Sequence, residues 1–185
     1  MDVGAGRGTA MRRLMLLRHA KSDGSVGGQS DAERALAPRG RAVAPVVGRY
    51  MAQHGLRPDL ALVSPARRTR ETWDLVGPAF DAPPPAKFDK RLYEARAAAI
   101  LAVIQQAPDE AHTLLLVGHN PGMQELANLL AASGDRDARQ ALAEKFPTAA
   151  LAVIDLPVDR WKDVRAQAGR LDRFVTPRAL TLEAD

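Results

Sequence analysis

The sequence contains no cysteine. This absence excludes disulfide bonds, zinc sites with cysteine ligands and any chemistry that uses a cysteine nucleophile. It also fits a reducing compartment, so we expect a cytoplasmic protein. Aromatic residues make up only 4% of the chain, which argues against a stacking platform for nucleic acid. Because no known nucleic-acid motif is present either, we expect no nucleic-acid partner.

Long apolar runs are also missing. No stretch approaches the roughly 18 apolar residues that a membrane-spanning helix needs, so we expect no membrane partner. The first residues lack the apolar segment of a secretory signal and predict a disordered tail over 1–12, followed by one domain over 13–185. No metal-ligand spacing links His54 or His112 to other ligands, and we expect neither a metal nor an organic cofactor. The pattern carries no signal for the oligomeric state.

What the chain does contain is arginine. The formal net charge is +4, and arginine strongly outnumbers lysine. The planar guanidinium fork matches phosphate and carboxylate oxygens. This composition favours an anionic partner, although general solubility would explain a modest positive charge equally well.

Short apolar runs alternate with segments of helical pattern. Strands are predicted over 14–17, 60–63, 113–117 and 149–154, with weaker ones near 87–88 and over 171–175. Helices are predicted over 38–54, 65–76, 95–106 and from Pro121 to about 132, while 77–86 and the charged segment 134–139 read as loops. Ser64 and Asn120 are the expected N-caps of the second and fourth helices. The alternation predicts an α/β fold with a largely parallel sheet.

Polar side chains follow three of these strands directly. Arg18 and His19 follow the first, Ser64 and the Arg67–Arg68 pair follow the second, and His119 follows the strand over 113–117. Ligands of parallel sheets bind at the carboxyl ends of the strands. Two helix N-termini at the same edge would add positive dipoles. The sequence therefore predicts a site for a multiply charged anion, most naturally phosphate.

Two imidazoles indicate more than phosphate binding. A neutral imidazole nitrogen can attack phosphorus, and arginine can balance the charge on the equatorial oxygens. A second, protonated imidazole could share that task.

Three motifs in the sequence resemble those of the histidine phosphatase superfamily. They are Leu17-Arg18-His19-Ala20-Lys21-Ser22, the segment from Val63 to Thr72, and Val117-Gly118-His119-Asn120-Pro121-Gly122. The first is similar to the small branch typified by the SixA phosphohistidine phosphatases, as are the segments around Phe146-Pro147 and Phe174-Val175. The similarity runs from about residue 13 to 180.

The resemblance implies a fold and a set of roles. The fold would be a three-layer α/β/α sandwich with a mostly parallel sheet and one antiparallel strand, for which 149–154 is the candidate. His19 would be the nucleophile, Arg18 and Arg68 would clamp the phosphoryl group, and His119 would stabilise the group in transfer. We also expect Ser22 and Asn120, which lie in the two histidine motifs, to contact the substrate.

Glu94 leaves two interpretations open. Arg91-Leu92-Tyr93-Glu94 resembles the stretch in which mutase-like members carry the acid that protonates the leaving oxygen. Glu94 could equally be a solvated first-turn residue of the following helix. An alkoxide leaving group needs such a proton donor, whereas a phosphorylated imidazole departs more easily.

Three functions follow from this pattern. The first is a phosphatase acting on phosphohistidine in a protein, which the short segment between Leu92 and Leu114 favours because larger relatives carry lid insertions there. The second is a phosphatase of small phosphate esters, with a mutase a less favoured variant because a mutase needs closure around its intermediate. The third is a non-catalytic phosphate-binding module.

Overall fold

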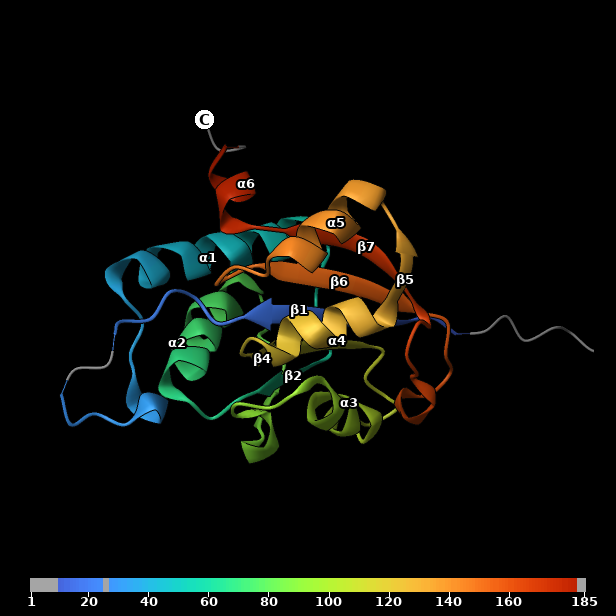
Figure 1. Cartoon of the computed structure of the whole chain (residues 1–185), viewed down its shortest axis with the longest axis horizontal. Helices are drawn as coiled ribbons and strands as arrows, with labels where there is room; N and C mark the ends of the chain where they lie inside the picture. The colour runs from blue at the N-terminus through green and yellow to red at the C-terminus, as the bar shows by residue number, and fades with distance from the viewer. Residues whose placement is uncertain (1–9, 25–26, 183–185) are drawn as a thin grey trace, which may run out of the picture.

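The computed structural model describes residues 10–24 and 27–182 of the 185-residue chain. Its seven strands form one sheet with the order β3-β2-β4-β1-β6-β7-β5 (Figure 1). The strands are β1 (Arg12–Arg18), β2 (Leu60–Val63), β3 (Ala86–Phe88), β4 (Thr113–Gly118), β5 (Ala131–Gly134), β6 (Leu151–Leu156) and β7 (Gly169–Val175). The α-helices are α1 (Pro38–Gln53), α2 (Arg67–Val76), α3 (Ala97–Gln105), α4 (Gly122–Leu130), α5 (Arg136–Glu144) and α6 (Pro177–Leu182).

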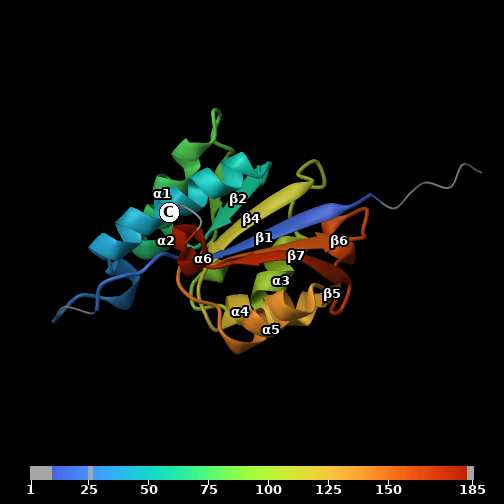
Figure 2. The ribbon, with the colours of Figure 1, turned by 90° about the horizontal axis from the view of Figure 1, so that it is seen from above.

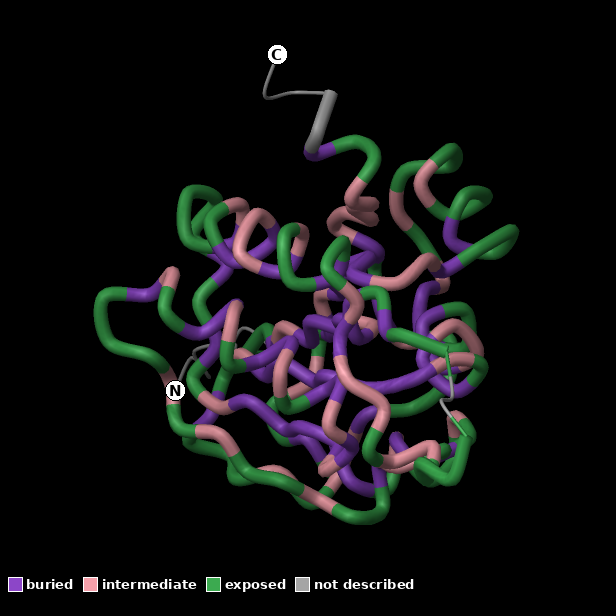
Figure 3. The backbone as a smooth tube through the Cα atoms, turned by 90° about the vertical axis from the view of Figure 1, so that its left-hand side faces the viewer, coloured by how far each residue is buried: buried purple, intermediate pink, exposed green. Residues whose placement is uncertain are grey.

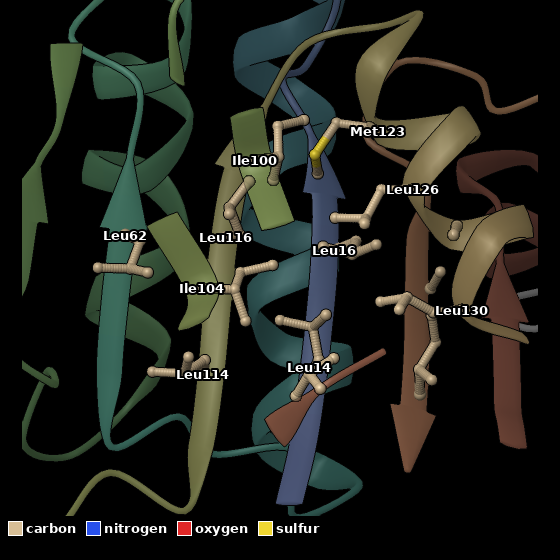
Figure 4. Close-up of a cluster of buried hydrophobic side chains, with 14 of the residues drawn as sticks. Leu14, Leu16, Leu62, Ile100, Ile104, Leu114, Leu116, Met123, Leu126 and Leu130 are labelled. Carbon is tan, nitrogen blue, oxygen red and sulfur yellow. The ribbon is translucent and has the colours of Figure 1, made fainter. Parts of the chain in front are cut away.

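The helices cover both faces of the sheet. Seen from above, α1, α2 and α6 lie on one side and α3, α4 and α5 on the other (Figure 2). Two hydrophobic clusters fill the two interfaces. Leu14 and Leu16 of β1 face α3 and α4 in one cluster (Figure 4), whereas Met15 and Leu17 face α1 and α2 in the other. The predicted three-layer α/β/α sandwich is confirmed.

This two-sided burial explains the continuous apolar runs of the sequence. A strand in the middle of a three-layer fold has no solvent face, so both alternating sets of side chains must be apolar. Residues 14–17 and 114–117 are fully buried. In Figure 3, the buried parts of the backbone run through the centre of the molecule and the exposed segments surround them.

One strand runs against the rest. β1 pairs in parallel with β4, and β4 in parallel with β2, whereas β6 is antiparallel to both β1 and β7. The prediction of a single antiparallel strand near 149–154 is therefore confirmed. Because β6 is reversed, its start lies beside the end of β1, where Leu151 pairs with Leu17.

Several predicted boundaries need correction. The charged segment 134–139 is not a loop, since it ends β5 and enters α5, whose N-cap Asp135 accepts a hydrogen bond from Ala138 N. The helix expected to reach about residue 132 ends at Leu130, because Ala131 already pairs with β7. The helix expected from Pro65 begins at Arg67, because Ala66 has extended backbone angles.

The predicted tail falls mostly outside the described residues, which begin at residue 10. Arg12, the last residue of that predicted tail, is instead the first residue of β1. It is buried, and its guanidinium donates to the main-chain oxygens of Asp159 and Ala111. Among the described residues, no helix is long and apolar enough to cross a membrane.

Candidate active site

The ends of β1, β2 and β4 bring the predicted residues to one edge of the sheet. Arg18 pairs with Gly118 and Val63 with Val117, so the residues that follow these strands are neighbours. The His19 and His119 ring centroids are 5.4 Å apart. The expected convergence of two imidazoles and arginines is therefore present.

These residues line a cavity of about 260 Å³, which we call the His19 pocket. All of the site residues predicted from the sequence line it. The lining residues are Arg18, His19, Lys21, Ser22, Asp31, Arg34, Arg68, Glu94, His119, Asn120 and Thr148. Within the described residues, no group of three or more His, Asp or Glu side chains is arranged to hold a metal ion. The pocket is lined mainly by cationic and neutral nitrogen groups, which suit an anion.

His19 is held as a neutral imidazole with one free nitrogen. Its Nδ1 lies 2.8 Å from the main-chain oxygen of Ala20. A carbonyl oxygen only accepts, so Nδ1 carries the proton and Nε2 keeps its lone pair. The pKa of His19 is lowered to about 3, mainly by burial and in addition by the nearby His119, Arg68 and Arg18, which together outweigh the hydrogen bond to Ala20 O. The ring is therefore unprotonated at neutral pH.

His119 is positioned by Ser64 rather than by a charged residue. Its Nε2 lies 2.7 Å from Ser64 Oγ, and its buried Nδ1 has no hydrogen-bond partner among the described residues. Burial lowers the pKa of His119 to about 4, with Arg68 the next cause. When the Ser64 hydroxyl donates to Nε2, Nδ1 carries the proton as a free donor.

This contact corrects the role predicted for Ser64. Ser64 was expected to cap a helix, but the cap position of α2 is Ala66 and carries no side-chain hydrogen bond. Thr69 Oγ1 instead donates to the main-chain oxygens of Ser64 and Ala66 at the start of α2. The Ser64 hydroxyl is therefore left for His119, a role that no local sequence signal indicated.

Arg18 presents a second unpartnered donor. Its Nη1 donates to Phe146 O at 2.9 Å, and its buried Nε has no partner among the described residues. Burial and the charge of Arg68 lower the pKa of Arg18. Two guanidinium groups that repel each other across a pocket are both stabilised by an anion between them.

Arg68 is buried and oriented by Asp31, a residue that the sequence analysis missed. Its Nη1 donates to Asp31 O at 2.7 Å and its Nη2 to Asp31 Oδ2 at 3.0 Å. The same carboxylate accepts from Tyr93 Oη at 2.7 Å and from Arg34 Nη1 at 2.9 Å. The bond from Tyr93 and those from Arg34 and Arg68 hold the pKa of Asp31 well below its usual range.

The other three predicted residues, Glu94, Ser22 and Asn120, occupy different parts of the pocket. Glu94 is exposed at its rim, has a positive φ of 50° and forms no hydrogen bond with the described residues. Ser22 is buried, and its Oγ accepts from Arg34 Nη2 at 2.9 Å. Asn120 donates from Nδ2 to Phe146 O at 3.1 Å and accepts weakly at Oδ1 from Gln124 N at 3.3 Å. Ser22 and Asn120 thus have structural partners in addition to their place at the pocket.

The turn before β6 closes the remaining side of the pocket. Ala149 N lies 3.0 Å from Arg18 O and 3.1 Å from His19 O, so one amide is shared between both carbonyls. Ala149 has a positive φ of 60°. Together with the bonds from Arg18 and Asn120 to Phe146 O, this contact ties the turn to the nucleophile candidate.

Comparison with known proteins agrees with this geometry. The sequence profile of the "Histidine phosphatase superfamily (branch 1)" matches residues 14–112, which include His19 and Arg68. An uncharacterised protein of Mycobacterium tuberculosis (strain H37Rv) is 37% identical over 164 residues, covering 88% of this chain and 100% of the relative.

Two solved structures share the fold over nearly the whole chain. A candidate SixA phosphohistidine phosphatase of Agrobacterium tumefaciens is 33% identical, with a TM-score of 0.74 and coverage of 90% of this chain and 98% of that one. A second candidate SixA protein, from Nakamurella multipartitia, is 29% identical, with a TM-score of 0.78 and coverage of 90% and 96%.

Proposed function

The chain belongs to the histidine phosphatase superfamily, and from that premise we propose that it removes phosphate from phosphohistidine in a protein by way of His19. The observation that carries this proposal is the state of His19. Its Nδ1 proton is committed to Ala20 O, and burial keeps the ring neutral at pH 7. Nε2 is then a nucleophile that needs no separate base.

In the first step, the lone pair of Nε2 forms a bond to phosphorus. The bond from phosphorus to the leaving atom breaks, and its electron pair goes to that atom. Charge on the equatorial oxygens is met by Arg18 and Arg68, and by Nδ1–H of His119. The unpartnered Arg18 Nε and His119 Nδ1 support these roles, because buried polar atoms in a folded protein normally have partners.

In the second step, water attacks the phosphoryl group on His19. The phosphorus–nitrogen bond breaks, its electron pair returns to Nε2 and inorganic phosphate leaves. The net reaction is hydrolysis.

The carboxyl groups of the pocket favour phosphohistidine as the substrate. Asp31 is ionised, since its pKa is held low by Tyr93, Arg34 and Arg68, so it cannot donate a proton to a leaving oxygen. Glu94 is the other carboxyl group among the described lining residues, and it is exposed at the rim. A phosphorylated imidazole can leave with a proton on its own ring, so it does not depend on either residue.

The position of Glu94 favours one alternative, a phosphatase of small phosphate esters. Glu94 lines the same cavity as His19. An ester that brings its leaving oxygen to the rim would find an acid there. The lack of cysteine fits the cytoplasm as the place of action for either function.

The two functions separate in one set of assays. Phosphate release is measured from a phosphohistidine peptide and from an aryl phosphate, for wild type, His19→Ala and Glu94→Gln. We expect His19→Ala to lower both activities by about a thousandfold or more. Glu94→Gln should leave the peptide rate within about twofold, because the leaving imidazole supplies its own proton site.

The matched control is His112→Ala, which removes an exposed histidine outside the pocket. It should leave both rates unchanged. Radiolabelled phosphate should be trapped on wild type and not on His19→Ala. If Glu94→Gln abolishes ester hydrolysis and the peptide is never turned over, the enzyme acts on small esters instead.

A further inference from the structure

A second hollow opens directly beside the His19 pocket. It has a volume of about 440 Å³, and we call it the basic groove. Its lining residues are Lys21, Arg39, Gly40, Val43, Lys145, Pro147, Thr148, Ala149, Thr176, Pro177 and Arg178. Lys21 and Thr148 line both hollows, so the groove adjoins the place where phosphate would bind.

The charge of the groove is of one sign. Four exposed cations lie along it, Lys21, Arg39, Lys145 and Arg178, and none of its described lining residues is Asp or Glu. Within the described part of the chain, Lys21, Arg39 and Lys145 form no ion pair. Exposed arginines elsewhere often do, as Arg67 does with Glu71 at 2.8 Å. The uncompensated positive charge of the groove is therefore that of Lys21, Arg39 and Lys145.

The fold holds the groove at a fixed place relative to His19. The end of β1, the start of β6 and the end of β7 lie at the same edge, since Leu151 pairs with both Leu17 and Val175. At the start of α1, a Cβ on Gly40 would lie 2.1 Å from Lys21 O, so that helix packs directly on the segment after His19. An anion in the groove would thus be held at a fixed position relative to His19.

We propose that the basic groove binds acidic side chains of the protein substrate that flank its phosphohistidine. This inference rests on the proposed function and names the class of protein that the enzyme prefers. The groove is larger than the His19 pocket, and its cations come from several separate segments of the chain. A flanking peptide segment in the groove would lie along several of these cations, and charge complementarity would select an acidic one.

The test compares two phosphohistidine peptides of equal length. One carries Asp and Glu around the phosphohistidine, and in the other these residues are Asn and Gln. We expect wild type to show a kcat/KM about tenfold higher for the acidic peptide, as several exposed ion pairs would give. The preference should shrink as salt is raised from about 0.05 M to 0.5 M, because the charges are exposed.

The variant Arg39→Gln/Lys145→Gln should lower the ratio of the two kcat/KM values to about two or less, since two of the groove's cations are lost. Turnover of the neutral peptide reports whether the variant folds. The matched control is Arg49→Gln/Lys162→Gln, which removes one exposed arginine of α1 and one exposed lysine, both outside the groove. It should keep the wild-type ratio.

Two results would overturn the inference while the proposed function stands. One is a wild-type ratio near one with both peptides turned over, and the other is a ratio that the groove variant leaves unchanged. A different result, in which neither peptide is turned over but the aryl phosphate is, rejects the proposed function and this inference with it.

Discussion

Arg68 gives both of its terminal nitrogens to Asp31, one to the main-chain oxygen and one to the carboxylate. The arginine is buried while the carboxylate is partly exposed, with side-chain exposures of 6% and 38%. Asp31 therefore both orients Arg68 and competes with phosphate for its charge.

Replacing this carboxylate should change stability and phosphate binding in opposite directions. Asp31→Asn leaves the charge of Arg68 without its counter-ion, and we expect a loss of about 1 kcal/mol in unfolding free energy, limited by the exposure of Asp31. Inorganic phosphate should then raise the melting temperature more in the variant than in wild type, because it becomes the balancing anion. Thermal melts with and without phosphate measure this. Asp23→Asn, an exposed aspartate of the same loop, is the control and should behave as wild type.

Ser64 should matter for turnover more than for substrate binding. Ser64→Ala removes the group that fixes the His119 ring, and we expect kcat to fall about tenfold with KM changed much less. Steady-state kinetics on an aryl phosphate measure the split. Ser133→Ala removes an exposed hydroxyl of β5 and should have no effect. Equal loss of activity in both variants would contradict the assignment.

The two pocket histidines should make the fold sensitive to mild acid. Their pKa values are about 3 and about 4 in the folded protein, against an ordinary value of 6.5. The unfolded chain therefore binds more protons between pH 6.5 and 4, so stability falls as the pH falls through this window. From pH 7 to pH 5 each histidine should cost up to about 2 kcal/mol.

Urea unfolding at the two pH values tests this expectation. His19→Gln and His119→Gln should each lose less stability on acidification than wild type. His112→Gln, which alters an exposed histidine, should lose as much as wild type. If all three variants followed the wild-type curve, the buried histidines would not be its source.

Gly40 should tolerate no side chain. A Cβ there would lie 2.1 Å from Lys21 O, which is main chain and cannot swing aside. We expect Gly40→Ala to destabilise the fold by about 2 kcal/mol or more and to lower phosphatase activity by shifting the segment after His19. Gly24→Ala meets nothing within 4 Å and serves as the control. Denaturant unfolding and aryl phosphate hydrolysis measure both effects.

The sequence predicted the central sheet well because its strands are buried on both faces. Residues 14–17, 60–63 and 113–117 are short apolar runs that a three-layer fold requires. The polar site residues that follow these runs could also be predicted, because the end of an apolar run is visible in the sequence. Segment 134–139 carries no apolar periodicity, because α5 buries only Leu142 and its first four residues include three charged ones. The Asp135 cap was the signal available there.

The residues that orient the pocket could not be read in this way. Asp31 lies in a segment with two other acidic residues, Asp23 and Glu33, and nothing local marks the one that meets Arg68. Ser64 precedes a predicted helix and so carries a strong helix-cap signal, yet its hydroxyl forms a hydrogen bond with His119 instead. Both contacts join residues that lie far apart in the chain, and a local sequence pattern does not predict contacts of this kind.

The reversed direction of β6 also bears on how this pocket can be altered. A parallel strand in its place would put the connection before it at the far edge of the sheet. Here the segment 145–149 enters beside the ends of β1 and β4 without being part of either strand-to-helix turn. Its contacts with Arg18 and His19 are made by main-chain atoms of Phe146 and Ala149, so the side chains of its other residues can be replaced while these contacts are kept. Laboratory libraries confined to Lys145, Pro147 and Thr148 would change which substrates are admitted and leave the phosphoryl-transfer chemistry in place.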